Sequence, residues 1–419
     1  MSWLPAELWL LVFEHVPWRE RFRLRAVSRE WRDLVQGAGS RFWLEVLVKA
    51  ARSGLLTSCE NGNIPVATWL TDRFGLTVAS ARANDNSALR KACANGHLAV
   101  AAWLVDRFGL LASDARAGEN YALSRACGNG HLAVARWLTD RFELTAADAR
   151  DCENYALREA CANGHLAVAA WLVDWFELTV DDAIDGDNFA LREACENGHL
   201  AVVTWLTDWF ELTADDARAD NNYALRYACA NGHLAVAVWL ADQFGLSASD
   251  AHASDNCALR CACEDGHLAV AVWLADRFEL TADDARDDDN LALCLACGNG
   301  HLAVATWLTD RFELTAADAR SRGNYALCLA CENGHLAAAT WLVDRFELTA
   351  ADARADDNFD LRWACANGHL AVAAWLADRF ELTAADARAG GNFALREACA
   401  RGHLAVAVWL TDRFGLSRP

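Results

Sequence analysis

The sequence has little proline, 4 residues in 419, and its glycines recur at regular places instead of clustering. Disordered chains are rich in proline and polar residues, whereas 54% of this chain is hydrophobic. No hydrophobic run is long enough to cross a membrane. The segment from Met1 to Pro17 lacks a basic leader and carries Glu7 and Glu14, so we expect no secretory signal. These absences predict a folded protein of the cytoplasm or nucleus.

Basic residues are also scarce: the chain has 38 Lys and Arg but 58 Asp and Glu, which gives a net charge of −20. Residues 1–50 hold eight basic and six acidic residues, a net of +2, so the rest of the chain carries about −22. An acidic surface repels phosphate backbones. We therefore expect no nucleic acid and no membrane among the partners.

A Trp-Leu pair recurs every 34 residues from Trp69 to Trp409, which defines eleven repeats. In the repeat that starts at Asn154, the Asn is expected to be the N-cap of a first helix that ends at Asn163-Gly164. A second helix follows from His165, and Thr179 starts a short third helix with capping-box spacing. The apolar positions cover more than half of the second helix, so neighbouring repeats must stack to bury it.

Eleven of the 16 cysteines recur once per repeat, four residues before a His in ten repeats, as in Cys93 and His97. Equivalent positions in stacked repeats lie on the order of 10 Å apart, too far for disulfides. A zinc site needs about four converging ligands, and these pairs are spread along the stack. We therefore predict buried thiols, a structural His at the Gly turn, and no metal or other cofactor.

The recurring Asp106-Arg107 pair is expected to be a surface ladder of weak ion pairs, because a catalytic site would occur once. The chain contains no phosphate loop, nucleophile elbow or kinase signature. The sequence thus predicts no catalytic residue and no enzyme.

The repeat Asn-x-Ala-Leu-Arg-x-Ala-Cys-x-Asn-Gly-His-Leu-x-Val-Ala-x-Trp-Leu resembles the ankyrin repeat over residues 53–419. It lacks the family's proline, has a period of 34 instead of 33, and replaces the β-hairpin finger by Phe-Glu-Leu-Thr-Ala-x-Asp-Ala-Arg, where we expect a short helix. Arrays of this variant resemble those encoded by giant DNA viruses of amoebae, which would place the protein in the host cell cytoplasm.

The first fifty residues read as three short helices, with Pro5 in the first turn and Pro17 between the first two. Their core is thin, so such a module is usually completed by a partner. Leu-Pro-x-Glu-Leu, a following apolar-Phe pair, a Leu and Val-Ser-Arg-x-Trp resemble the F-box, with Ser28 where Cys is common. This resemblance implies docking onto the Skp-type adaptor of cullin ubiquitin ligases, through Leu4, Pro5, Leu8, Phe13, Leu24, Val27 and Trp31. Alternatively, the segment only caps the first repeat.

Two positions of the first helix vary between repeats from charged to aromatic and apolar. In ankyrin-like stacks this side lines a groove, so we expect a target-binding surface there, although drift on a tolerant surface would look the same. Trp175 and Trp209 replace an Arg in adjacent repeats and either form an anchor patch or pack on each other. The predicted target-binding residues are Glu159, Glu193, Tyr223, Tyr227, Leu295, Leu329, Trp363, Trp175 and Trp209.

The sequence therefore predicts an all-α protein, with a three-helix F-box-like docking module in residues 1–50 and an α-solenoid of eleven ankyrin-like repeats in residues 51–419, the first and last atypical. The expected function is a protein-binding adaptor that recruits an unknown protein target to a Skp-type adaptor and a cullin ligase. A scaffold or decoy that binds partners without promoting ubiquitylation is the alternative. We expect a monomer apart from the ligase complex.

Overall fold

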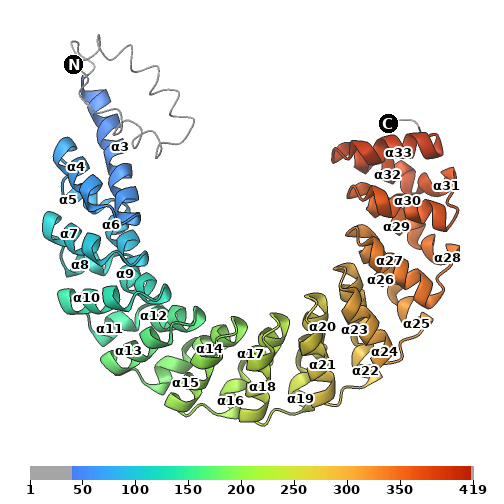
Figure 1. Ribbon diagram of the computed structural model, residues 1–419, viewed down its shortest axis with the longest axis horizontal. Helices are drawn as coiled ribbons and strands as arrows, with labels where there is room; N and C mark the ends of the chain where they lie inside the picture. Colours follow the sequence, from blue (N-terminus) through green and yellow to red (C-terminus); the bar gives the residue numbers. More distant parts are fainter. Residues whose placement is uncertain (1–39, 417–419) are drawn as a thin grey trace. The chain divides into compact units, whose positions relative to one another are not determined.

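The computed structural model describes residues 40–416, with side chains from Val48 onward, and within that range the regular elements are all helices (Figure 1). The predicted all-α array of about eleven 34-residue repeats is thereby confirmed, including the short helix in place of a β-hairpin. None of the helices in residues 40–416 is both long and apolar enough to span a bilayer.

The chain divides into two compact units. Unit 1 runs to Ala190 and includes Asp208–Phe210, and unit 2 consists of Leu191–Thr207 and everything from Glu211 onward. The helices that begin in unit 1 are α3 Ser40–Glu60, α4 Ile64–Phe74, α5 Val78–Ala81, α6 Ala83–Ala94, α7 Leu98–Phe108, α8 Ala112–Ala115, α9 Ala117–Gly128, α10 Leu132–Phe142, α11 Ala146–Ala149, α12 Asp151–Ala162, α13 Leu166–Phe176 and α14 Val180–Glu196.

Unit 2 continues the same three-helix repeat. Its helices are α15 Leu200–Phe210, α16 Ala214–Ala217, α17 Ala219–Ala230, α18 Leu234–Gln243, α19 Ala248–Ala251, α20 Ala253–Glu264, α21 Leu268–Arg277, α22 Ala282–Ala285, α23 Asp287–Gly298, α24 Leu302–Arg311, α25 Ala316–Ala319, α26 Ser321–Glu332, α27 Leu336–Phe346, α28 Ala350–Ala353, α29 Ala355–Ala366, α30 Leu370–Arg379, α31 Ala384–Ala387, α32 Ala389–Ala400 and α33 Leu404–Phe414.

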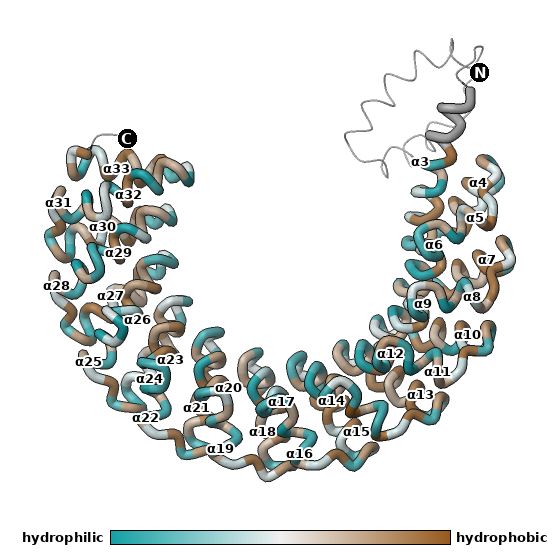
Figure 2. The backbone as a smooth tube through the Cα atoms, turned by 180° about the vertical axis from the view of Figure 1, so that it is seen from behind, coloured by the Kyte–Doolittle hydropathy of each residue, from teal (hydrophilic) through white to brown (hydrophobic). Residues whose placement is uncertain are grey.

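Each repeat consists of a first helix, a second helix and a short helix, and the first helices stack directly on one another within each unit. In unit 1 α6 packs on α9 and α9 on α12, and in unit 2 α17, α20, α23, α26, α29 and α32 form the same row. Apolar and polar positions are interleaved along these helices (Figure 2), so that Ala, Leu and Cys of one side fill the space between neighbours. The stack is therefore built from small side chains that let the helices approach closely.

Three consecutive residues with left-handed backbone angles interrupt the start of each described first helix from α6 onward, within the bounds given above. In the repeat of Asn154 these are Cys152, Glu153 and Asn154, with φ between 52° and 56°. Asn, Asp and Gly, which tolerate this conformation best, dominate the segment in the other repeats. The prediction that Asn154 caps the helix is wrong: its Oδ1 has no partner, and its Nδ2 instead donates to Asp185 of the next repeat at 3.1 Å.

The turn between first and second helices holds a glycine that the next repeat covers. Gly164 has φ of 76°, as the predicted helix stop requires. A Cβ on Gly96 would lie 2.6 Å from Nδ1 of His131, so the imidazole of one repeat packs on the glycine of the preceding one. His97 Nε2 lies 3.0 Å from the carbonyl oxygen of Glu60. The periodic His therefore has the structural role that its position predicted.

The second helices are less buried than their apolar pattern predicted. Val100, Ala101 and Leu104 of α7 are buried, whereas Trp103 is half-buried and stands edge-on to Phe108, with ring centroids 5.9 Å apart. Of the eleven periodic tryptophans only Trp171 is buried. The indole packs against the Phe of its own repeat, and part of it remains exposed.

Ten of the eleven periodic cysteines are buried free thiols, as predicted, and Cys399 in the last repeat is half-buried. All 16 cysteines lie within the described residues, and none of them forms a disulfide. Burial raises the pKa of the Cys59 thiol to about 12 and raises the pKa of Cys93 further. These thiols act as small packing groups in the stack.

Arginine at the end of most short helices links successive repeats, whereas Ile184 and His252 take its place in two of them. In most repeats its guanidinium forms an ion pair with the Asp of the next short helix, and that Asp is largely buried. Asp352, for example, accepts from Arg320 Nε at 2.7 Å and Nη2 at 3.1 Å. It also accepts from the backbone N–H and the hydroxyl of Thr349, at 2.7 and 2.9 Å. One carboxylate thus caps its own helix and joins two repeats.

We expect Asp352→Ala to destabilise the array by about 1–3 kcal/mol at pH 7, because both the cap and the ion pair are lost. The hydrogen bonds from Arg320, then those from Thr349, lower the pKa of Asp352 to about 2, below the ordinary value near 3.9. This stabilisation is therefore present above about pH 4 and is lost as the pH falls towards 2. Urea unfolding of wild type and variant between pH 7 and pH 2.5 measures this stabilisation. If the difference in their free energies of unfolding does not shrink in acid, Asp352 does not have the proposed role.

Candidate binding face on the first helices

Two positions of each first helix, four residues apart, project from the stack while their neighbours are buried. In α12, Tyr155 and Glu159 are half-buried, whereas Leu157, Ala160 and Cys161 are buried. Residues four apart lie on the same side of a helix. We call these positions, with the residue before the second one, the first-helix face. Within unit 2 the first helices, such as α17 and α20, lie on the inner side of the curve of that unit (Figure 1).

In unit 1 the first-helix face is charged and interlocked between repeats. Lys91 Nζ lies 2.7 Å from Glu60, and Arg125 Nη1 lies 3.2 Å from Glu159. The guanidinium of Arg125 also lies 5.5 Å from the ring centroid of Tyr121. Lys91 is therefore held by the preceding repeat and Arg125 by the next one, which reduces the entropy that binding a partner would cost.

In unit 2 the face begins with stacked aromatic rings. Tyr223 and Tyr227 stack with centroids 3.9 Å apart and planes 17° apart. The Tyr223 hydroxyl donates to Glu196, and burial followed by this carboxylate raises the pKa of Tyr223 well above its ordinary value. Arg192 lies 4.0 Å from the Tyr223 centroid. The aromatic platform thus has an acidic and a basic edge.

Towards the C-terminal end of unit 2 the face becomes apolar. Leu295 and Leu329 are half-buried on α23 and α26. Trp363 on α29 contacts Phe359 and Phe393 with centroids 5.8 and 5.4 Å away. Arg401 lies 5.5 Å from the Trp363 centroid, and a half-exposed Trp beside an Arg is typical of protein-binding surfaces.

The structure places seven of the nine predicted target-binding residues on this face, all half-buried. Glu159 belongs to unit 1, and Glu193, Tyr223, Tyr227, Leu295, Leu329 and Trp363 belong to unit 2. Trp175 and Trp209 lie elsewhere, on the second helices α13 and α15, with 53% and 55% of their surface exposed. Trp175 contacts Trp171 of its own helix at 6.4 Å between centroids. The structure therefore separates these two tryptophans from the first-helix face.

The predicted adaptor-docking residues lie outside the described residues. They are Leu4, Pro5, Leu8, Phe13, Leu24, Val27 and Trp31. Their docking role stays a prediction.

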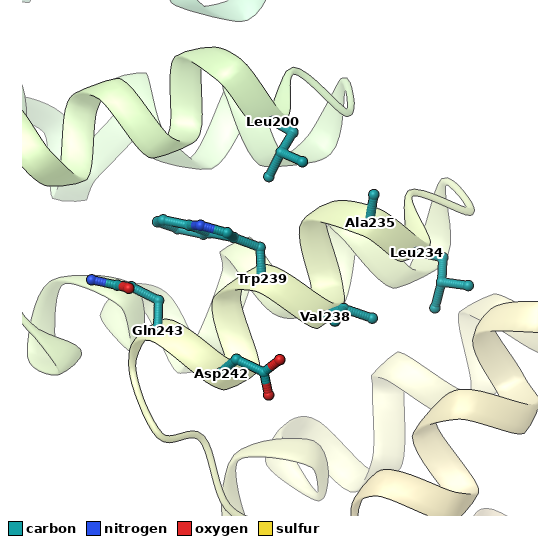
Figure 3. Close-up of a pocket in the computed structure, with 7 residues that line it drawn as sticks. All are labelled: Leu200, Leu234, Ala235, Val238, Trp239, Asp242 and Gln243. Carbon is teal, nitrogen blue, oxygen red and sulfur yellow. The ribbon is translucent and has the colours of Figure 1, made fainter.

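An open recess lies on the second-helix side of unit 2, with a volume of about 800 Å³ (Figure 3). Leu200 of α15 and Leu234, Val238 and Trp239 of α18 line it, with Asp242 and Gln243 at one edge. Gln243 stands where most repeats carry the Arg of the surface ladder, such as Arg107. This departure is visible in the sequence, but Gln243 was not among the predicted site residues. The recess is wide and has few polar groups, so it offers apolar contact area but few groups that could orient a ligand or react with it.

The charged ladder of the second helices is confirmed as a set of exposed pairs, such as Arg379 with Asp344 at 3.2 Å. Acidic loop tips also form ion pairs with neighbouring repeats: Asp288 pairs with Arg260 at 3.2 Å and with Arg322. No group of three or more His, Cys, Asp or Glu side chains within residues 40–416 is arranged to hold a metal ion.

Comparison with known families finds two modules in the chain. Residues 1–43 match the F-box domain, and residues 123–216 and 191–284 match the family described as ankyrin repeats in three copies. No curated protein matches the chain significantly. The chain thus carries an F-box domain at its N-terminus followed by ankyrin repeats, both non-catalytic adaptor modules. The matches give no support to a viral source.

Proposed function

We propose that the chain is the substrate-recognition subunit of an SCF-type cullin ubiquitin ligase. The observation that supports this most directly is the presence of an F-box domain and an ankyrin array in one chain, with a row of dissimilar side chains on the first-helix face. The F-box implies a Skp-type adaptor as the partner of residues 1–50. The mechanism is proximity: holding the target near a ubiquitin-loaded enzyme raises its effective concentration there.

The target is proposed to bind the first-helix face of unit 2, through Tyr223, Tyr227, Leu295, Leu329 and Trp363, and Glu193 beside them. These side chains combine aromatic and apolar surface with charged groups at the rim, the composition of binding hot spots. Glu159 in unit 1 and the exposed Trp175 and Trp209 are further proposed contacts. Free thiols throughout the chain fit a reducing compartment, the cytoplasm or the nucleus.

The docking half of the proposal predicts that the full chain binds a purified Skp-type adaptor and that Leu8→Ala combined with Trp31→Ala reduces this binding at least tenfold. Both side chains are apolar anchors in the F-box resemblance, and losing each typically costs more than about 1 kcal/mol. A pull-down with the purified adaptor measures the effect.

Asp276→Ala, in an exposed pair on a second helix, is the matched control and should leave adaptor binding unchanged. Adaptor binding that survives the double substitution contradicts the docking proposal. A chain that binds adaptor and target without shortening the target's lifetime would be a scaffold or decoy.

A further inference from the structure

One pair of thiols differs from every other cysteine in the chain. Cys257 and Cys261 lie four residues apart on α20, at the two projecting positions of the first-helix face, where most other repeats carry aromatic, charged or aliphatic side chains. Their sulfur atoms are 3.5 Å apart, and both side chains are half-buried. The pair is therefore accessible from the face, whereas Cys263 on the same helix is buried in the core.

Positive charge surrounds the first of these sulfurs. Arg226 Nη1 on α17 lies 3.7 Å from Cys257 Sγ, and Arg260 precedes Cys261 and pairs with Asp288 of α23 at 3.2 Å. The negative charge of Glu264 on α20 raises the pKa of Cys261. The buried Cys229 of α17 is a further titratable neighbour of Cys257. A sulfur with a thiol donor on one side and a guanidinium on the other is stabilised as the thiolate.

A hydrogen bond joins the two thiols. The hydrogen bond from Cys261, and then the guanidinium of Arg226, lower the pKa of Cys257 well below the ordinary thiol value. The same hydrogen bond raises the pKa of Cys261. Cys257 is thus the nucleophile of the pair, and Cys261 is its hydrogen-bond donor.

We propose that Cys257 is a covalent modification site that reacts with small-molecule disulfides, forming a mixed disulfide on the first-helix face of unit 2. The Cys257 thiolate attacks one sulfur of the disulfide, the sulfur–sulfur bond of the reagent breaks, and the departing thiolate takes a proton from water. One disulfide is exchanged for another, so the step needs no other oxidant.

The helix prevents the pair from closing on itself. Cβ atoms four residues apart on a helix are about 5–6 Å apart, whereas a disulfide needs about 3.5–4.5 Å. Cys261 therefore does not displace the adduct without unwinding α20, and the mixed disulfide persists until an external thiol removes it.

Cys152 provides an internal control. It is an exposed thiol, but its Sγ lies 2.7 Å from Glu119 Oε2, and this hydrogen bond, with burial and neighbouring acids, raises the pKa of Cys152 to about 11. If exposure alone decided reactivity, Cys152 would react first. If thiolate stabilisation decides, Cys257 reacts first near neutral pH.

The test exposes the full native chain to oxidised glutathione at pH 6.5 and pH 9.5, quenches in acid and maps the adducts by mass spectrometry. Cleavage after Arg260 separates Cys257 from Cys261.

At pH 6.5 we expect Cys257 to react at least about tenfold faster than Cys152, because a thiol of pKa 11 is almost wholly protonated there. At pH 9.5 this lead should vanish or reverse, since the more basic thiolate of Cys152 is the stronger nucleophile once formed. Faster reaction of Cys152 at pH 6.5, or adducts mainly on Cys261, overturns the proposal.

Two variants test the activating contacts separately. Cys261→Ala should move the midpoint of the pH–rate profile of Cys257 to higher pH and raise its rate at pH 9.5, where the more basic thiolate is the stronger nucleophile. Cys261→Ser keeps a hydroxyl donor, so its profile should stay closer to that of wild type. Arg226→Met should act in the same direction as Cys261→Ala, so that the test does not depend on one variant folding. Circular dichroism verifies each fold, and a pH–rate profile of Cys257 that is the same as in wild type in both folded variants also overturns the proposal.

Discussion

Asp360→Ala is expected to stabilise the protein, and by more at pH 8 than at any lower pH. Asp360 occupies the Ala position of the Asn-x-Ala-Leu motif in α29 and is 2% exposed. Neither of its carboxylate oxygens has a clear hydrogen-bond partner, with only the weak thiol of Cys328 beside it. A buried carboxylate without partners is among the most costly groups a core can hold.

The pH dependence follows from the pKa of this carboxyl. Burial raises the pKa of Asp360 to about 7, from about 3.9 in the unfolded chain. Unfolding therefore releases a proton between about pH 4 and pH 7, and stability falls as the pH rises through this window. We expect the gain from Asp360→Ala to be about 2–4 kcal/mol larger at pH 8 than at pH 4, because each pKa unit corresponds to about 1.4 kcal/mol and unfolded-state burial reduces the full value.

Urea unfolding followed by circular dichroism at pH 4, 6 and 8 measures the gain. Asp360→Asn is the matched control: it stays neutral, so it should remove the pH dependence while keeping the cost of an unpaired polar group. An Ala variant with the same gain at pH 4 and pH 8 would mean that Asp360 is not charged in the folded protein at pH 8 or finds a partner there.

Gly232→Ala is expected to destabilise unit 2 by about 2–4 kcal/mol, a larger loss than an ordinary surface Gly→Ala change. Gly232 has φ of 78°, and a Cβ there would lie 2.6 Å from Nδ1 of His267 in the next repeat. The left-handed backbone alone costs about 1–2 kcal/mol for a residue with a Cβ, and the contact with the imidazole adds to it. Urea unfolding of the single variant measures the loss.

A double-mutant cycle with His267→Ala separates the two causes. Removing the imidazole gives the new methyl group room, so the added cost of Gly232→Ala should fall to the backbone part, about 1–2 kcal/mol. Gly75→Ala, whose Cβ would meet nothing within 4 Å at a similar φ of 61°, is the matched control for the backbone part. Equal costs of Gly232→Ala with and without His267 would exclude packing between repeats as the cause.

The periodicity of the sequence predicted the repeat, its turn glycines and its short helix, because each depends on local geometry repeated in register. It failed at Asn154, whose propensity to cap a helix gave way to a left-handed backbone and a hydrogen bond to the next repeat. It also overestimated the burial of tryptophans such as Trp103, because a pattern on one helix does not tell how far the neighbouring helix reaches.

The sequence predicted which residues form the first-helix face, but it did not predict which side chains contact one another there. Variable residues such as Tyr227 and Trp363 could be assigned to one side of the first helix from spacing alone. The Arg226–Cys257 contact and the Tyr223–Glu196 hydrogen bond join residues about one repeat apart, and they exist only once the stacking register is set. The sequence did signal the unusual position of Asp360, because nine other repeats have Ala there and the first has Gly. The cost of this Asp became visible only with its burial.

The most direct test of the adaptor function is affinity purification of the full chain with mass spectrometry, in wild type and in two variants. We predict that wild type recovers a Skp-type adaptor, a cullin and a target, that Leu8→Ala with Trp31→Ala loses the ligase components and keeps the target, and that Tyr227→Ala with Leu329→Ala does the reverse. If either variant loses both sets or neither, the proposed division between an adaptor-docking module and a target-binding face is contradicted.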